Sequence, residues 1–182
     1  MTDGGAFTKL GEDELVRAFH FNVVRAHYRS PTGEEFSRDI VHHPGAVAVV
    51  PLHDDGTVTL VRQFRAALER ELLELPAGLR DVAGEADEDT AARELVEEAG
   101  LAAGSLEHLV SFVNSPGFCD EDVAVFLATE LSDVPHDRQG TEEHAMTLER
   151  LPLEEAIDLV TSGEITDAKT IIGLTLAARR RP

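Results

Sequence analysis

Three glutamates crowd the short segment ARELVEEAGL, which spans residues 92–101. Glu94, Glu97 and Glu98 stand three and four positions apart, so a helix here would place their carboxylates on one side. Like charges at this spacing cost about 0.2–0.5 kcal/mol for each pair. The spacing alone leaves two interpretations open. Either the helix exposes an acidic face to solvent, or the carboxylates form an oxygen-rich site for a hard cation such as Mg²⁺.

The residues around these glutamates predict the helix itself. Apolar side chains recur at i, i+3, i+4 and i+7, which predicts a stripe that faces the core, with the glutamates on the opposite side. The residues of this stripe are Ala92, Leu95, Val96 and Ala99. We expect the helix to begin near residues 87–89, where aspartates can cap free N–H groups, and to end at Gly100.

The wider segment GLRDVAGEADEDTAARELVEEAGL resembles the Nudix box, G-x5-E-x7-R-E-U-x-E-E-x-G-U, in which U is a bulky apolar residue. Every defined position from Glu85 to Leu101 matches this pattern. One departure is that six residues, not five, separate Gly78 from Glu85, so the loop is one residue longer. The resemblance implies a hydrolase of nucleoside diphosphates linked to another moiety.

The rest of the chain predicts the elements that position this helix. Two strands flank a turn at residues 30–33. Further strands are expected at 46–52, 57–64, 71–75, 107–113, 122–130 and 145–151, and helices at 153–161 and 167–180. Together with the resemblance, this order predicts an α+β protein with the α-β-α sandwich of the Nudix fold. In it a mixed β-sheet lies between helices, and a small N-terminal β-hairpin lobe precedes the sheet.

Two flanking segments narrow the resemblance. ELPAGL (74–79) and SPGFCDE (115–121) look like the ADP-ribose pyrophosphatase branch of the family. This implies Mg²⁺-dependent hydrolysis of ADP-ribose to AMP and ribose 5-phosphate by a metal-activated water, with two or three ions and Mn²⁺ as a substitute. It also implies a homodimer, in which residues 1–43 contribute to dimerisation and to the substrate site of a Nudix domain at 44–182. Alternatives are another substrate, such as ADP-glucose or NADH, and a non-catalytic ADP-ribose sensor, which would typically lack box carboxylates.

The resemblance assigns the metal site to four residues. Glu94 and Glu98 are the expected ligands, together with the backbone carbonyl of Ala77, and Glu97 is a further ligand or a water-orienting acid. Arg93 is expected to orient these carboxylates through charge-assisted hydrogen bonds. A general base is expected in RQGTEEHAMTL (138–148), where Glu142 and Glu143 are the candidates and an exposed acidic loop is the alternative.

Six further residues are candidates for substrate contacts. Arg65 and Arg38 suit a diphosphate because a guanidinium binds oxyanions in a bidentate manner, although each could instead form a surface ion pair. Glu74 would bond adenine or ribose, or cap a strand edge. Phe36 would stack on adenine, or belong to the core. Pro116 and Gly117 are expected to shape the wall around the terminal ribose.

Composition excludes several classes of protein. A net charge of -19 argues against binding to a nucleic-acid backbone. No apolar run approaches the roughly 18 residues that span a bilayer, so no membrane segment is expected. The N-terminus lacks the features of a secretory signal. The single cysteine, Cys119, favours a reducing, cytoplasmic setting, and neither it nor the pair His42 and His43 is assigned a metal.

Overall fold

The computed structural model describes residues 6–136 and 144–180. The chain divides into two compact units, which are described separately. Unit 1 consists of residues 1–45 and 113–122, and unit 2 consists of residues 46–112 and 123–182. None of the helices in the described ranges is long and apolar enough to cross a membrane.

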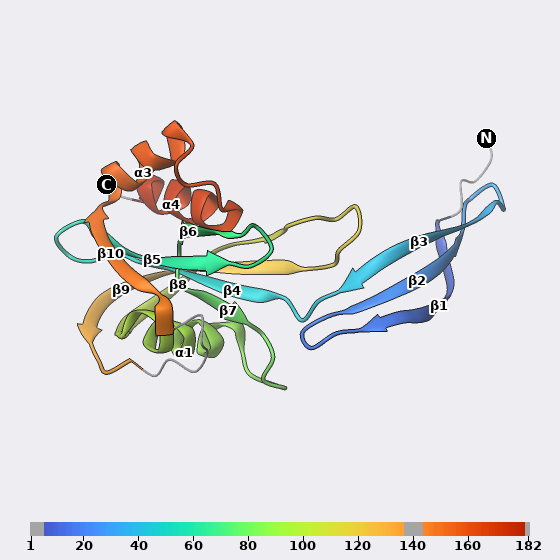
Figure 1. Cartoon of the computed structure of the whole chain (residues 1–182), viewed down its shortest axis with the longest axis horizontal. Coiled ribbons are helices and arrows are strands. Elements are labelled where there is room, and N and C mark those ends of the chain that lie inside the picture. The colour runs from blue at the N-terminus through green and yellow to red at the C-terminus, as the bar shows by residue number, and fades with distance from the viewer. Residues whose placement is uncertain (1–5, 137–143, 181–182) are drawn as a thin grey trace. The chain divides into compact units, whose positions relative to one another are not determined.

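Unit 1 contains an antiparallel sheet in the order β1-β2-β3 (Figure 1). Its strands are β1 (Thr8–Arg17), β2 (Asn22–Arg29) and β3 (Glu35–His42). Strands β2 and β3 confirm the predicted pair, and Gly33 supplies the left-handed turn between them with a φ of 90°. Strand β1 was not predicted, because all ten of its residues are exposed and its sequence, TKLGEDELVR, has no regular apolar alternation.

Unit 2 contains two sheets. The mixed sheet has the order β7-β4-β9-β8, with β4 parallel to β9 and antiparallel to β7. The antiparallel sheet has the order β10-β5-β6. The bounds of these strands are β4 (Ala46–Pro51), β5 (Thr57–Arg65), β6 (Arg70–Glu74), β7 (Ala77–Leu79), β8 (Leu101–Val113), β9 (Asp122–Asp133) and β10 (Thr147–Pro152).

Helices cover both faces of the mixed sheet in unit 2 (Figure 1). Helix α1 (Asp87–Ala99) lies on one face, and α3 (Leu153–Ser162) and α4 (Ala168–Arg180) lie on the other. The alternation of β4 accounts for this arrangement, because successive side chains point to opposite faces. Val47 and Val49 pack in the cluster of α1, whereas Ala48 and Val50 pack in the cluster of α3 and α4. The predicted α-β-α sandwich is confirmed.

The ends of α1 explain the main local differences from the prediction. Gly100 ends the helix in the left-handed conformation, as predicted, and the chain enters β8 directly at Leu101 rather than at residue 107. At the other end the N-cap residue is Ala86, which has no side-chain capping bond, so the predicted aspartate cap was wrong. Asp87 instead pairs with Arg80 at 3.2 Å. Residues 77–79, for which no strand was predicted, form β7 and thereby fix the backbone beside α1.

Candidate active site

Helix α1 buries two of its glutamates. Its buried residues are Thr90, Ala91, Glu94, Leu95, Glu98 and Ala99, whereas Ala92 is exposed. The buried side of the helix is therefore rotated from the predicted stripe toward Glu94 and Glu98, which are 8% and 5% exposed. The prediction that they lie opposite the core was wrong, because apolar periodicity assumes that a carboxylate remains in water.

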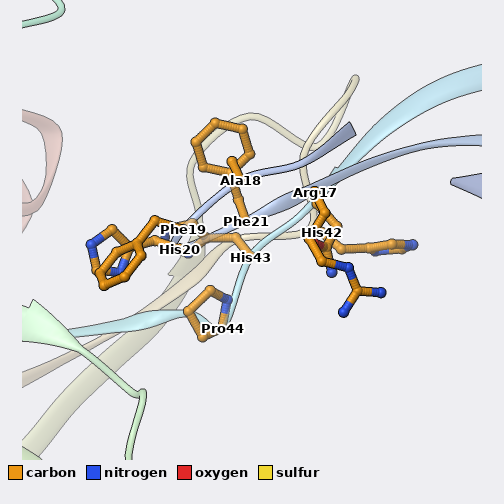
Figure 2. A pocket seen from close by; sticks show the side chains of 9 residues that line it. Arg17, Ala18, Phe19, His20, Phe21, His42, His43 and Pro44 are labelled. Atoms are coloured by element: carbon orange, nitrogen blue, oxygen red, sulfur yellow. The ribbon is translucent and has the colours of Figure 1, made fainter. Parts of the chain in front are cut away.

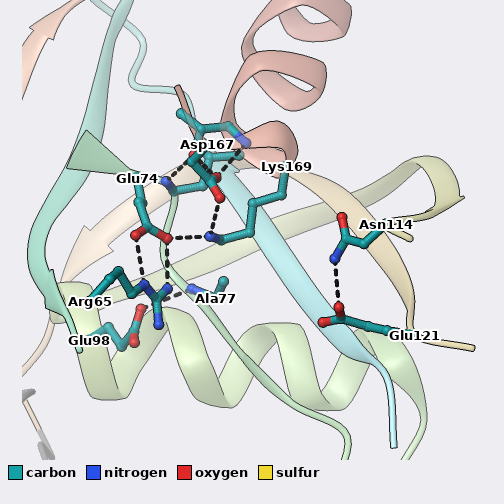
Figure 3. A network of polar contacts seen from close by, with 10 residues as sticks. Arg65, Glu74, Ala77, Glu98, Asn114, Glu121, Asp167 and Lys169 are labelled. Carbon is teal, nitrogen blue, oxygen red and sulfur yellow. Dashed lines mark hydrogen bonds and ion pairs between the residues drawn. The ribbon is translucent and has the colours of Figure 1, made fainter. Parts of the chain in front are cut away.

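The carboxylate of Glu98 lies against the start of β7. The backbone N–H of Ala77 donates to Oε2 of Glu98 over 2.9 Å (Figure 3). Burial, with a smaller contribution from the charge of Glu94, raises the pKa of Glu98 to about 8. This raised pKa favours the protonated form of Glu98 in the metal-free protein. A divalent cation bound by this carboxylate would displace that proton.

Glu94 packs directly on the backbone of β7. A Cβ atom added to Gly78 would lie 2.0 Å from Cδ of Glu94, closer than atoms can approach. Only glycine at position 78 therefore leaves room for this carboxylate. Gly78 of the ELPAGL segment thus lies directly against Glu94, a predicted metal ligand.

Arg93 contacts three carboxylates of the Nudix box. Its Nη1 donates to Oε1 of Glu94 over 2.6 Å and to Oε2 of Glu97 over 3.1 Å. Its Nη2 donates to Oε2 of Glu85 over 3.3 Å, and the hydroxyl of Thr90 donates to the same oxygen. These contacts are the ones expected if Arg93 orients the carboxylates and Glu85 connects the loop to the helix. The roles of both residues in the reaction remain predictions.

The donors at this site suit a hard divalent cation in their chemistry. Three carboxylates within one helical turn, two of them almost removed from water, supply the oxygen ligands that Mg²⁺ prefers. No group of three acidic, histidine or cysteine side chains within residues 6–136 and 144–180 is already gathered at ligand spacing. The bonds from Arg93 to Glu94 and Glu97 occupy oxygens that an ion would require.

A second polar cluster joins the ends of β5 and β6 to α4 (Figure 3). The carboxylate of Glu74, which is 1% exposed, accepts hydrogen bonds from Nε and Nη2 of Arg65 over 2.7 and 2.6 Å. Lys169 forms an ion pair with the same carboxylate. These two cations outweigh the effect of burial and lower the pKa of Glu74. Glu74 thus contacts protein cations rather than presenting a free carboxylate, which differs from the expected substrate contact.

Lys169 was not identified from the sequence. It follows Asp167 at the expected start of the last helix and is one of two lysines in the chain, but no motif marks it. Glu142 and Glu143, the candidate bases, lie outside the described residues.

The other predicted substrate contacts meet in unit 1. Phe36, Arg38, Pro116 and Gly117 line a cavity of about 520 Å³, together with Phe7, Tyr28, Ile40, Val113, Phe118, Cys119 and Asp120. The rings of Tyr28 and Phe36 stack with centroids 5.5 Å apart, and the guanidinium of Arg38 lies 4.9 Å from the centroid of Phe36. This aromatic wall can receive a flat ring, and Arg38 can supply a positive charge beside it.

Two histidines without an assigned role hold one side of this cavity. Nδ1 of His42 bonds Oδ2 of Asp120 at 2.5 Å, and Nε2 of His42 bonds Glu12 of β1 at 3.2 Å. The backbone N–H of His43 donates to the other oxygen of Asp120. Both carboxylates raise the pKa of His42. Asp120 thus ties residues 115–121 to the end of β3.

The same histidines border a separate hollow of about 490 Å³ in unit 1 (Figure 2). Its lining is formed by residues 17–22 and 42–44. Phe19, at the turn between β1 and β2, is 94% exposed. This hollow contains none of the residues predicted for the site.

Comparison with known proteins identifies the family. Residues 42–172 match the NUDIX domain. The chain is 47% identical to the ADP-ribose pyrophosphatase of Bacillus subtilis (strain 168) over 140 residues, which cover 77% of this chain and 75% of that protein. It is 42% identical to the ADP-ribose pyrophosphatase of Mycobacterium tuberculosis (strain ATCC 25618 / H37Rv) over 168 residues, or 92% of this chain and 81% of that protein.

A solved structure supports the fold. A crystal structure of an ADP compounds hydrolase superposes with a TM-score of 0.82 and covers 96% of this chain and 94% of that chain. At 24% sequence identity the likeness concerns the fold alone.

The close approach of Glu94 to β7 predicts the effect of Gly78→Ala. The added methyl group meets the end of a flexible side chain, so Glu94 swings away while the fold persists. We expect a change in the free energy of unfolding of about 1 kcal/mol or less, but a loss of Mg²⁺ binding of at least about tenfold, measured by calorimetry. Unchanged Mg²⁺ affinity would show that Glu94 need not occupy this position.

The raised pKa of Glu98 predicts how stability depends on pH in EDTA-treated protein. Between the unfolded pKa near 4.5 and the folded value of about 8, the native state retains a proton that the unfolded state loses. Stability therefore falls as pH rises through this window, by up to about 1.4 kcal/mol per pH unit, and the loss ends above pH 8. Urea titrations should show a shallower fall for Glu98→Gln. Parallel curves for the two proteins would refute the assignment, since His42 contributes equally to both.

Proposed function

Because this chain belongs to the NUDIX domain family and is a Nudix hydrolase, we propose that it hydrolyses the diphosphate bond of ADP-ribose. One water is consumed, and the products are AMP and ribose 5-phosphate. The observation that carries this proposal is the 47% and 42% identity to two ADP-ribose pyrophosphatases over most of the chain. The presence of Glu94, Glu97 and Glu98 argues against a sensor that binds without cleaving.

In unit 2, the proposal assigns Glu94, Glu98, Glu97 and the carbonyl of Ala77 to binding two or three Mg²⁺ ions. Bound Mg²⁺ would supply Lewis-acid stabilisation of the charge that develops on the diphosphate. Arg93 would align the carboxylates, because its donors already reach two of them. Outside this group, Arg65 would present its guanidinium to the diphosphate while Glu74 holds it.

Within unit 1, we propose that residues lining the aromatic cavity are substrate contacts. Phe36 would stack on adenine and Arg38 would lie beside it, in keeping with the stacked rings of the cavity wall. Pro116 and Gly117 would shape the surface around the terminal ribose.

Glu142 or Glu143 would accept the proton of the attacking water. Changing each of the two glutamates to Gln would identify the base, and full activity in both variants would refute this assignment.

We further propose that the enzyme acts as a homodimer through β1. This edge strand is exposed along its whole length, and its Leu10, Leu15 and Val16, with Phe7 just before it, leave apolar surface uncovered. Covering these apolar side chains with a second copy of the chain would remove them from water and stabilise the sheet. Light scattering should give twice the chain mass of 19.8 kDa. A monomer at micromolar concentration would contradict the dimer.

The cytoplasm is the proposed setting, because the chain has a single cysteine and therefore no internal disulfide. Recovery of the native protein from a secreted fraction would contradict this location.

A product assay tests the proposed reaction. Purified protein with Mg²⁺ is offered ADP-ribose, ADP-glucose, NADH and a diadenosine polyphosphate side by side. We expect AMP and ribose 5-phosphate to form fastest from ADP-ribose. A faster reaction with another compound would overturn the substrate but not the hydrolase chemistry. Binding of ADP-ribose without any cleavage would instead support the sensor.

A pair of variants on α1 tests the site. Glu98→Gln removes the charge of a buried predicted ligand, and we expect kcat to fall by at least about a hundredfold while the fold is retained. Glu88→Gln, on an exposed part of the same helix, removes the same charge and should leave kcat unchanged. A Glu98→Gln enzyme as fast as the wild type would refute the metal-ligand role.

A further inference from the structure

Lys169 is a partly buried lysine in a chain whose basic residues are mostly arginine. Lys9 and Lys169 are the only lysines among 16 basic residues. The side chain of Lys9 is 45% exposed on β1, whereas that of Lys169 is 13% exposed. Nζ of Lys169 pairs with Oδ1 of Asp167 at 3.0 Å and with Oε2 of Glu74. Its ammonium has three donors and can therefore bond to both carboxylates at once.

Both carboxylates that bind Lys169 are held by other contacts. The second oxygen of Asp167 accepts hydrogen bonds from the backbone N–H and the hydroxyl of Thr170, at the start of α4. The hydroxyl of Thr170 also accepts a hydrogen bond from the backbone N–H of Leu75, next to Glu74. Helix α4 is thereby attached to the end of β6. Lys169 thus occupies a fixed position between two fixed acids.

Glu74 connects Lys169 to Arg65. Two nitrogens of the guanidinium donate to the buried carboxylate, while 38% of the Arg65 side chain is exposed. Figure 3 shows Arg65 beside both Glu74 and Glu98, close to Ala77. The cation proposed to meet the diphosphate is therefore in direct contact with the acid that Lys169 neutralises.

A charge count shows what Lys169 contributes. Arg65 and Lys169 supply two positive charges, and Glu74 and Asp167 supply two negative charges, so the group is neutral. Without Lys169 the group carries one net negative charge beside Glu98. That charge would repel an anion approaching Arg65, and in a partly buried site such repulsion is substantial.

We propose that Lys169 is a positioning residue for the diphosphate of the substrate. By neutralising Glu74 and Asp167, it leaves the charge of Arg65 available to the anion and keeps the guanidinium aligned through Glu74. This inference rests on the proposed function in taking a nucleoside diphosphate as the ligand. It adds a residue of α4 that belongs to neither the Nudix box nor its flanking segments.

Five variants test this inference. Lys169→Met keeps the length of the side chain but removes the charge, and Lys169→Arg restores the charge. Arg65→Ala and the double variant Lys169→Met/Arg65→Ala test whether Lys169 acts through Arg65. Arg150→Met is the matched control, since Arg150 pairs with Asp55 at an exposed position. The measurements are KM and kcat for ADP-ribose, and the Kd of α,β-methylene-ADP with Mg²⁺, which reports binding without cleavage.

We expect Lys169→Met to raise KM and Kd about tenfold while kcat stays within about threefold. The lost interaction would bind the ground state and the transition state equally, so its removal weakens binding without slowing the bound complex. Lys169→Arg should recover most of the binding. The double variant should bind no more weakly than Arg65→Ala alone, and Arg150→Met should match the wild type.

Three results would overturn the inference: a Kd for Lys169→Met equal to that of the wild type, an Arg variant that binds no better than the Met variant, or fully additive losses in the double variant. If Lys169 served only to pack the fold, binding would depend on the size of the side chain, and restoring the charge with Lys169→Arg would not restore binding. If the wild type cleaves no ADP-ribose, the proposed substrate fails, whereas the Kd series with α,β-methylene-ADP still decides the role of Lys169.

Discussion

The structure of unit 2 depends on the burial of two carboxylates on one side of α1. Removing a charged carboxylate from water costs several kcal/mol unless hydrogen bonds or opposite charges compensate. Glu98 is compensated by the N–H of Ala77 and by the proton that its raised pKa retains. Glu94 is compensated by Arg93. The antiparallel pairing of β7 with β4 fixes the backbone on which both carboxylates rest.

The cations of this strongly acidic chain are arranged around its buried carboxylates. A net charge of -19 repels a diphosphate at long range, so positive charge must be concentrated where the anion binds. Arg93 lies beside the carboxylates of α1, and Arg65 with Lys169 lies at the ends of β5, β6 and α4. Each of these cations is held by a carboxylate, so its position does not depend on the ligand. Such preorganisation lowers the entropic cost of binding.

Much of this fold could be predicted from the sequence, and the failures share a physical cause. Features that depend on neighbouring residues in the sequence were predicted correctly. Examples are the end of α1 at the left-handed Gly100 and the valine-rich strand β4. The buried side of α1 was predicted wrongly because Glu94 and Glu98 are buried, which their charged side chains alone do not indicate. Strand β1 and the role of Lys169 were not predicted because both depend on partners elsewhere in the chain. The partner of the strand is β2, and that of the lysine is Glu74. Tertiary contacts, rather than local preference, decide such cases.

The two units carry different parts of the proposed reaction. The acidic helix and the cations Arg93, Arg65 and Lys169 belong to unit 2, where β4 and α1 share one packed core. The aromatic cavity belongs to unit 1, where a loop and exposed strands form its walls. Chemistry at a diphosphate is the same whatever group the nucleoside diphosphate carries, so it benefits from a rigid scaffold. Recognition of the attached group requires different surfaces for different substrates, and loops tolerate such variation best. Substitutions at Pro116 are therefore expected to alter substrate choice, whereas those at Glu98 are expected to abolish the reaction itself.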